Sequence, residues 1–325
     1  SHFNLALDLV SDIFLHSTLR KEELEKERGV ILEEIKMIKD TPMHYIEDLW
    51  ERLLYKDQPA GWDIVGRKEI VSKIQRDDLV KYLDSHYSAR NTVIGIAGKI
   101  NSKETPDLVK RYFSDIKKEE PKRKAKVKEE QKEPEKLFFK KDTEQTHLAV
   151  GVRTFNIFDK RRYSLSVLGT LLGGNMSSRL FQELRVKRGL AYYVSTQIEA
   201  NPDTGYLVTF TGIDHQKISE VVTLILKEYK KIKEKIIDLR EVKRSKEYLK
   251  GRLRLSLEES EDTASFYALQ ELLEERILTP EEKIKEIEKV TPVQIQEVAK
   301  EIFKEDRLNI AVISPKEQEF KHFTF

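Results

Sequence analysis

Two glutamates stand at helical spacing within an apolar run, where a carboxylate can serve as a metal ligand. Residues 24–38 repeat apolar side chains with the period of an amphipathic helix. On a helical wheel Glu27 and Glu34 fall inside the apolar arc, one above the other. Because a buried ionised carboxylate must be paired or bind a metal, two interpretations are open. Either the acids lie at an exposed edge of the arc or pair with arginines, or they form a metal ligand and a neighbouring carboxylate.

Other residues that could bind a metal are sparse. The sequence contains no cysteine, so a metal site here must use histidine and carboxylate ligands. No two of its seven histidines are four residues apart, and the motif H-x-x-E-H does not occur. This chain alone therefore cannot assemble a zinc site with three protein ligands.

The composition is that of a soluble globular protein and excludes several function classes. Hydrophobic residues make up 39% of the 325 residues, and charged residues make up 36%. The 59 Lys and Arg residues nearly balance the 57 Asp and Glu residues, so we expect no nucleic-acid partner. No run of 18 apolar residues occurs, so we expect no membrane span. We expect a cytoplasmic location, because the N-terminal residues lack a signal-peptide pattern.

A polar segment and an internal repeat organise the chain. Residues 117–136 contain one Val and one Ala among polar, charged or Pro residues, which is typical of an exposed linker. The predicted domains on its two sides, 1–116 and 137–325, carry amphipathic segments in the same order. Three pairs of segments match at offsets of 215, 218 and 216 residues, which predicts a duplication. The matched positions are Phe3 and Ile218, Leu24 and Val242, and Leu79 and Ile295.

The second copy is predicted to contain a sheet packed on helices. Strand patterns cover residues 137–141, 146–155, 190–200 and 205–213, and helical patterns cover 161–174 and 177–189. In the first copy, the counterpart of this segment would precede Ser1, and only residues 92–97 form a confident strand. One strand cannot make a sheet, so we expect a missing N-terminal segment to complete the first domain.

The strings ERGVILEEIKMIKDTP, YKDQPAGWDIVG and LVKYLDSHYSARNTVIGIAG resemble the pitrilysin, insulinase and processing-peptidase family of inverted zincins. The resemblance implies an α+β fold of two homologous α/β-roll domains, each an antiparallel sheet packed on helices, with the first domain incomplete. It implies Zn²⁺ as the cofactor, with Glu34 of VILEE as a metal ligand. Glu27 matches a family acid that supports the catalytic site.

The string GGNMSSRLFQELRVKRGLAYYV in the second copy resembles the same family. Arg185 and Tyr192 match a pair that contacts substrate near the scissile carbonyl. A fixed charge and a hydroxyl donor suit a developing oxyanion there. Gly173 and Gly174 are further substrate-binding candidates. They could instead cradle a phosphate, but no Walker lysine accompanies them, and we expect them to end one helix and free the loop before the next.

The two copies differ at the ligand positions. At an offset of 218, Glu27 and Glu34 correspond to Ser245 and Arg252, so we expect no zinc in the second domain. The chain also departs from the family pattern at Glu47, a position where the family often carries a histidine; this departure is smaller than the missing H-x-x-E-H.

The resemblance implies a zinc metalloendopeptidase that cleaves peptides or unfolded segments in a chamber between paired halves. It would act as a homodimer or as a heterodimer with a homologous subunit, and this chain alone would be inactive. The alternative is a non-catalytic partner subunit of the same fold. Retention of Glu34 together with Arg185 and Tyr192 favours the enzyme. A nucleic-acid binder would need clustered Arg and stacking aromatics, which the linker lacks.

Overall fold

The computed structural model describes residues 2–274 and 276–317. The helices in these ranges are α1 (Phe3–Leu15), α2 (Lys21–Asp40), α3 (Pro42–Tyr55), α4 (Lys68–Val71), α5 (Arg76–His86), α6 (Thr105–Tyr112), α7 (Arg162–Gly173), α8 (Ile218–Glu234), α9 (Leu239–Leu255), α10 (Ser260–Leu273), α11 (Pro280–Lys289) and α12 (Pro292–Ile302). The strands are β1 (Glu135–Lys140), β2 (Thr146–Arg153), β3 (Ala191–Ala200), β4 (Gly205–Ile213) and β5 (Leu308–Ser314).

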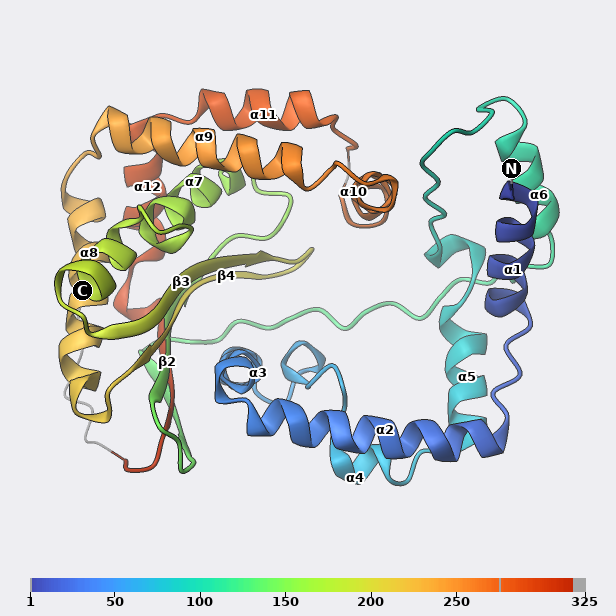
Figure 1. Ribbon diagram of the computed structural model, residues 1–325, viewed down its shortest axis with the longest axis horizontal. Helices are drawn as coiled ribbons and strands as arrows, with labels where there is room; N and C mark the ends of the chain where they lie inside the picture. The colour runs from blue at the N-terminus through green and yellow to red at the C-terminus, as the bar shows by residue number, and fades with distance from the viewer. Residues whose placement is uncertain (1, 275, 318–325) are drawn as a thin grey trace. The chain divides into compact units, whose positions relative to one another are not determined.

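One five-stranded sheet has the order β1-β5-β2-β4-β3 (Figure 1). Only β1 and β5 run parallel, and the other neighbours are antiparallel. The predicted α+β class is therefore confirmed, with one parallel pair in a sheet that was expected to be antiparallel.

The chain forms two compact units. The sheet unit comprises residues 37–64, 125–255 and 278–325, and the helical unit comprises residues 1–36, 65–124 and 256–277. Each unit combines segments from both sides of the linker. The predicted domain boundary at residues 117–136 separates the two copies of the sequence repeat, and it stays a prediction.

The core of the sheet unit covers both faces of the sheet. Val150 and Leu207 belong to a cluster with α7, α8 and α12 on one face. Their neighbours Ala149 and Val208 belong to a second cluster with α3 on the other face. Successive side chains of a strand point to opposite faces, so helices on both sides bury every residue of β2, β4 and β5.

The repeat reappears as matched helices. The helices α3 and α10 each have 14 residues and begin 218 residues apart, and α5 and α12 each have 11 residues and begin 216 apart. However, α3 belongs to the sheet unit while its counterpart α10 belongs to the helical unit. The first copy therefore contributes α3 to the sheet unit, which holds the strands of the second copy. The second copy contributes α10 to the helical unit, which holds the strand-like residues 92–97 of the first copy. For this reason the units do not follow chain order.

The expected strand at residues 92–97 is not formed. These residues have no strand assignment in the structure, although their counterpart at an offset of 216 is β5. A β-strand requires a hydrogen-bonded neighbour, and the described part of the helical unit contains none.

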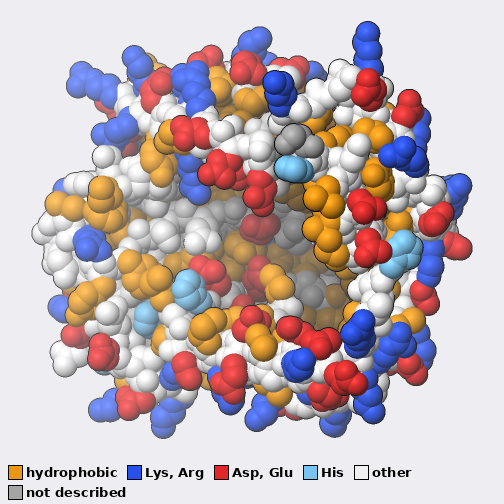
Figure 2. Space-filling model, turned by 45° about the vertical axis from the view of Figure 1, so that its right-hand side comes forward, with side chains coloured by type: hydrophobic (Ala, Val, Ile, Leu, Met, Phe, Trp, Pro, Cys, Tyr) orange, Lys and Arg blue, Asp and Glu red, His pale blue; other side chains and the backbone are white. Residues whose placement is uncertain are grey.

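The surface agrees with the balanced composition. Figure 2 shows Lys and Arg side chains intermixed with Asp and Glu side chains over the visible face, with apolar side chains between them. Within the described residues, every helix is too short or too polar to cross a membrane.

Candidate functional site

The expected metal ligand Glu34 and its supporting acid Glu27 lie on α2. Both side chains are exposed, whereas Ile35 is the buried residue of this helix and Ile31 is half-buried. Of the two interpretations left open by the sequence, the structure agrees with the exposed edge of the arc, and the assignment of Glu34 as a metal ligand stays a prediction. The half-buried face of α2 is rotated toward Arg28 and Leu32, which leaves the two glutamates at an exposed edge of the arc.

The orientation of α2 is set by an arginine that the sequence argument did not identify. Arg28 donates hydrogen bonds to the carbonyl oxygens of Val71 and, at 2.8 Å, Ile74, which tie α2 to the segment around α4. Its Nε and Nη2 also donate to the Glu25 carboxylate at 3.0 and 3.1 Å. A guanidinium offers five donors in a fixed fork, so it can satisfy two carbonyls and a carboxylate at once. The available signal was a cation between Ile35 and Leu32 on the helical wheel.

The described residues do not hold a zinc ion by themselves. Among residues 2–274 and 276–317, no group of three His, Cys, Asp or Glu side chains is arranged to bind a metal. Zinc sites in enzymes need three protein ligands, so the donors around Glu34 do not fit the metal without further ligands.

The expected substrate contacts Arg185 and Tyr192 lie on consecutive elements of the sheet unit. Arg185 belongs to η3 (Phe181–Lys187), a π-helical segment, and is exposed, with its guanidinium 5.6 Å from the centre of the Phe181 ring. Gly189, at a φ of 62°, adopts the left-handed conformation in the turn from η3 into β3.

Tyr192 occupies a β-bulge. Ala191 pairs with Ile213 and Tyr193 pairs with Gly212, so Tyr192 has no partner on β4. Its side chain is 56% exposed. A bulge redirects a side chain, which accounts for the exposure of Tyr192 beside the buried Ala191. Tyr192 and Arg185 are therefore both open to a ligand, while Glu27 and Glu34 belong to the helical unit.

The two glycines differ in their surroundings. Gly173 is buried where α7 packs on β3, and a Cβ there would lie 2.2 Å from Thr196 Oγ1 and 2.6 Å from the Thr196 backbone nitrogen. Gly174 is the residue after α7, and its N–H donates to Thr170 O at 3.1 Å. The expectation that these glycines end a helix is confirmed. Gly173 is buried and allows α7 to pack closely on β3, whereas Gly174 is half-buried.

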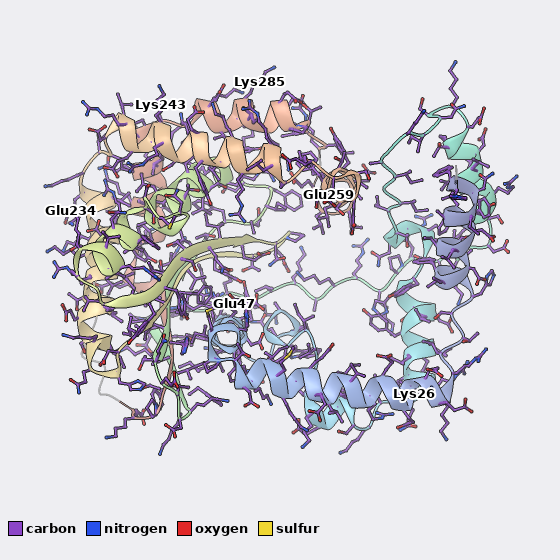
Figure 3. The ribbon with its side chains drawn as sticks, in the orientation of Figure 1. Lys26, Glu47, Glu234, Lys243, Glu259 and Lys285 are labelled. Carbon is purple, nitrogen blue, oxygen red and sulfur yellow. The ribbon has the colours of Figure 1, made fainter. Side chains whose placement is uncertain are left out.

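A carboxylate cluster joins α3 to β3 and β4, and the sequence argument missed it. Glu47, labelled on α3 in Figure 3, accepts a hydrogen bond from Gln197 Nε2 of β3 at 3.5 Å. One turn later, Glu51 accepts a hydrogen bond from Tyr206 Oη of β4 at 3.0 Å. The available signal was the spacing of Glu47 and Glu51, which places both acids on one side of a helix that also carries seven buried apolar and aromatic residues.

Burial perturbs the proton affinity of this cluster. Desolvation raises the pKa of Asp48 to about 6, and the nearby Asp63 raises it as well, against the opposing effect of Arg52. Desolvation also raises the pKa of Glu51 and of Glu199. Arg52 donates to both oxygens of Asp63 at 3.0 Å and so is shared between two acids. Asp48 can therefore take up a proton in mildly acidic solution.

Two family profiles and several named proteins are similar to this chain. A family profile described as Insulinase (Peptidase family M16) matches residues 1–68, and one described as Peptidase M16 inactive domain matches residues 73–249. The chain is 36% identical over 315 residues to the uncharacterized zinc protease YmxG of Bacillus subtilis, covering 97% of this chain and 76% of that protein. It is 32% identical over 319 residues to an uncharacterized zinc protease of Mycobacterium leprae, covering 97% and 71%.

Solved structures share the fold. A protease from Helicobacter pylori superposes with a TM-score of 0.88 at 21% identity, covering 97% of this chain and 77% of that one. A peptidase M16 inactive domain from Pseudomonas fluorescens gives a TM-score of 0.86 at 17% identity, covering 97% and 76%. The two family profiles and the 36% identity to the Bacillus subtilis relative show that the chain belongs to the insulinase family of peptidases, family M16.

Proposed function

We propose that this chain is part of a zinc-dependent metalloendopeptidase that hydrolyses peptides or unfolded protein segments. The proposal rests on 36% identity, over 97% of the chain, to a protein named a zinc protease. Glu34 would supply one carboxylate to the metal, and Glu27 would support the site electrostatically. The two histidines that a family site requires would come from polypeptide outside these 325 residues, in which H-x-x-E-H does not occur.

The substrate would bind at the sheet unit. β3 is an edge strand, so the backbone groups on its outer side can pair with an extended peptide. Arg185 and Tyr192 would then stabilise negative charge near the scissile carbonyl by fixed charge and hydroxyl donation. A chamber formed by paired halves, within a homodimer or a heterodimer with a homologous subunit, would limit substrates to flexible chains.

The metal assignment is tested in the full-length protein by comparing Glu34→Gln with Glu33→Gln. Glu33 is the adjacent exposed glutamate and pairs with Lys36, so it controls for loss of a surface charge. We expect Glu34→Gln to lower both bound zinc and cleavage of an unfolded peptide at least about 100-fold, because catalysis depends on the metal. Glu33→Gln should retain both. Undiminished zinc content and activity in Glu34→Gln would refute the assignment.

The substrate contacts have a separate test. Arg185→Gln should reduce peptide cleavage by about 10- to 100-fold without loss of zinc, whereas Lys187→Gln on the same segment should leave cleavage unchanged. Equal activity of the two variants would remove Arg185 from the proposal. The 325-residue chain alone is expected to hydrolyse nothing.

A second proposal is a non-catalytic partner subunit of the same fold. It is supported by the family profile described as Peptidase M16 inactive domain, which matches residues 73–249. The coding sequence upstream of Ser1 separates the two proposals, because an intact H-x-x-E-H there supports the enzyme and a degenerate motif supports the partner subunit.

A further inference from the structure

A hydrogen bond joins two strands of the sheet unit that are not neighbours. His147 Nδ1 of β2 lies 3.0 Å from Tyr193 Oη of β3, and the centres of the two rings are 5.9 Å apart. In the sheet order, β4 lies between these two strands, which places them about 10 Å apart. The Tyr193 side chain therefore crosses the width of β4 to reach its partner.

A glycine on β4 leaves space for this crossing. Gly212 pairs with His147 on one side and with Tyr193 on the other, so the three residues form one row across the sheet. A Cβ at Gly212 would lie 2.5 Å from Tyr193 Cε1 and 2.9 Å from Tyr193 Cδ1. Because Gly212 has no side chain, the Tyr193 ring can lie over β4.

Both partners of this hydrogen bond are uncharged near pH 7. Burial, with a smaller effect from His215, lowers the pKa of His147 to about 4. Burial also raises the pKa of Tyr193, and the nearby Glu47 carboxylate of α3 raises it further. A neutral imidazole carries one donor and one acceptor, and a phenol can take either role, so both tautomers of His147 can form the bond. Because His147 is buried, loss of this partner would leave a polar nitrogen unpaired.

The row lies next to the β-bulge at Tyr192. Because Tyr192 has no partner on β4, its direction depends on how its neighbours in the chain are held. Tyr193 is held at two points: its hydroxyl by His147, and its carbonyl oxygen by Thr211 Oγ1, which donates to it at 2.7 Å. With Tyr193 turned inward and half-buried, Tyr192 is turned outward and is 56% exposed.

The two adjacent tyrosines give β3 a competing register. Without the bulge, Tyr192 would follow Ala191 in pairing with β4 and would stand opposite Gly212. Its ring would then occupy the place over β4 that the Tyr193 ring now fills, and its hydroxyl would satisfy His147. As long as Tyr193 satisfies His147, no unpaired polar group draws Tyr192 inward.

We propose that His147 and Tyr193 are positioning residues for Tyr192: their hydrogen bond over Gly212 holds Tyr193 inward and keeps the Tyr192 hydroxyl outside, where a substrate can meet it. This inference rests on the proposed function, in which Tyr192 donates a hydrogen bond near the scissile carbonyl. His147 and Tyr193 act on the reaction through Tyr192 alone.

The position of Tyr192 is measured first, in protein freed of metal with EDTA, by nitration with tetranitromethane and fragmentation mass spectrometry. Tyr193→Phe keeps the ring but removes the hydroxyl that His147 binds. The unpaired imidazole then favours Tyr192 as its partner, so we expect nitration of Tyr192 to slow at least about threefold. Tyr229→Phe is the matched control and should leave this rate unchanged, because it removes a buried hydroxyl that lies 2.7 Å from Thr209 Oγ1 on the opposite face of the sheet.

A double variant distinguishes positioning from loss of packing. His147→Leu combined with Tyr193→Phe replaces both polar partners by apolar side chains, so no unpaired group draws the Tyr192 hydroxyl inward. We expect the nitration rate of Tyr192 in this variant to return to within about twofold of the wild-type rate. A rate in Tyr193→Phe that equals or exceeds the wild-type rate, or no recovery in the double variant, would overturn the proposal.

Peptide cleavage by the full-length protein then tests the consequence for catalysis. Tyr193→Phe should lower kcat about tenfold and change KM less than about twofold, because Tyr192 acts on charge that develops in the transition state. The double variant should recover kcat. In a Tyr192→Phe background, Tyr193→Phe should lower kcat no further, and a further loss there would contradict the proposal.

Failure of the proposed function gives a different result. If Tyr192→Phe by itself leaves kcat unchanged, the oxyanion role of Tyr192 is refuted. The nitration rates, which need neither metal nor activity, still decide whether His147 and Tyr193 position Tyr192.

Discussion

Gly173→Ala separates a packing role from a substrate-binding role at this position. The added methyl group would lie 2.2 Å from Thr196 Oγ1, 2.6 Å from Thr196 N and 2.8 Å from Thr196 Cβ. The hydroxyl is held by a hydrogen bond with Thr209 at 2.9 Å, and the backbone nitrogen belongs to β3. The methyl can therefore be accommodated only if α7 moves away from the sheet.

The magnitude follows from two opposing effects. Overpacking a dense core costs about 1–3 kcal/mol. Alanine has a helix propensity up to about 1 kcal/mol better than glycine, but Gly173 is the last residue of α7, where that gain is smaller. We expect the free energy of unfolding to fall by about 1–2 kcal/mol, which lowers Tm by several degrees.

The matched control is Gly251→Ala within α9. No atom outside its own helix lies within 4 Å of a Cβ at Gly251, so only the propensity gain operates there. We expect this variant to raise the free energy of unfolding by up to about 1 kcal/mol. Urea unfolding followed by circular dichroism measures both variants, and peptide cleavage is assayed in the full-length protein. An unchanged midpoint for Gly173→Ala, combined with lost cleavage, would refute the packing explanation and support substrate contact.

Two further changes test the sheet unit. Asp48→Asn should remove a pH dependence: because the pKa of Asp48 is raised to about 6, its stabilising contribution is present below its unfolded pKa and is lost as pH rises through about 6. After allowance for solvent screening, the free energy of unfolding measured in urea should fall by about 1 kcal/mol more in the wild type than in the variant between pH 4 and pH 7. An equal change in the two proteins would contradict the raised pKa of Asp48. Arg153→Met should cost about 3 kcal/mol, because the Arg153 side chain is 7% exposed, donates to Leu54 O and Gln131 Oε1, and lies 3.7 Å from Glu129. A fall of less than about 1 kcal/mol in the free energy of unfolding would show that water satisfies Leu54 O, Gln131 and Glu129 in the variant.

Much of the fold could be predicted because helical and strand periodicities are local. The strand at residues 205–213 has the predicted limits, and the helix predicted at 161–174 is α7. Family-like strings also selected Arg185 and Tyr192 as site candidates, and their role stays a prediction. However, the β-bulge at Tyr192 could not be predicted, because it depends on how β3 pairs with β4.

The sequence by itself determined the duplicated order of elements, the family and the residue types available for chemistry. The tertiary structure decided which helix covers which sheet face, and it placed α3 and α10 in compact units that do not follow chain order. It also turned Glu27 and Glu34 to an exposed edge, because Arg28, about a third of a turn away around α2, ties that helix to Val71 and Ile74. Amphipathic periodicity states that a helix has an apolar face, but only packing partners brought together from distant parts of the chain determine what that face contacts.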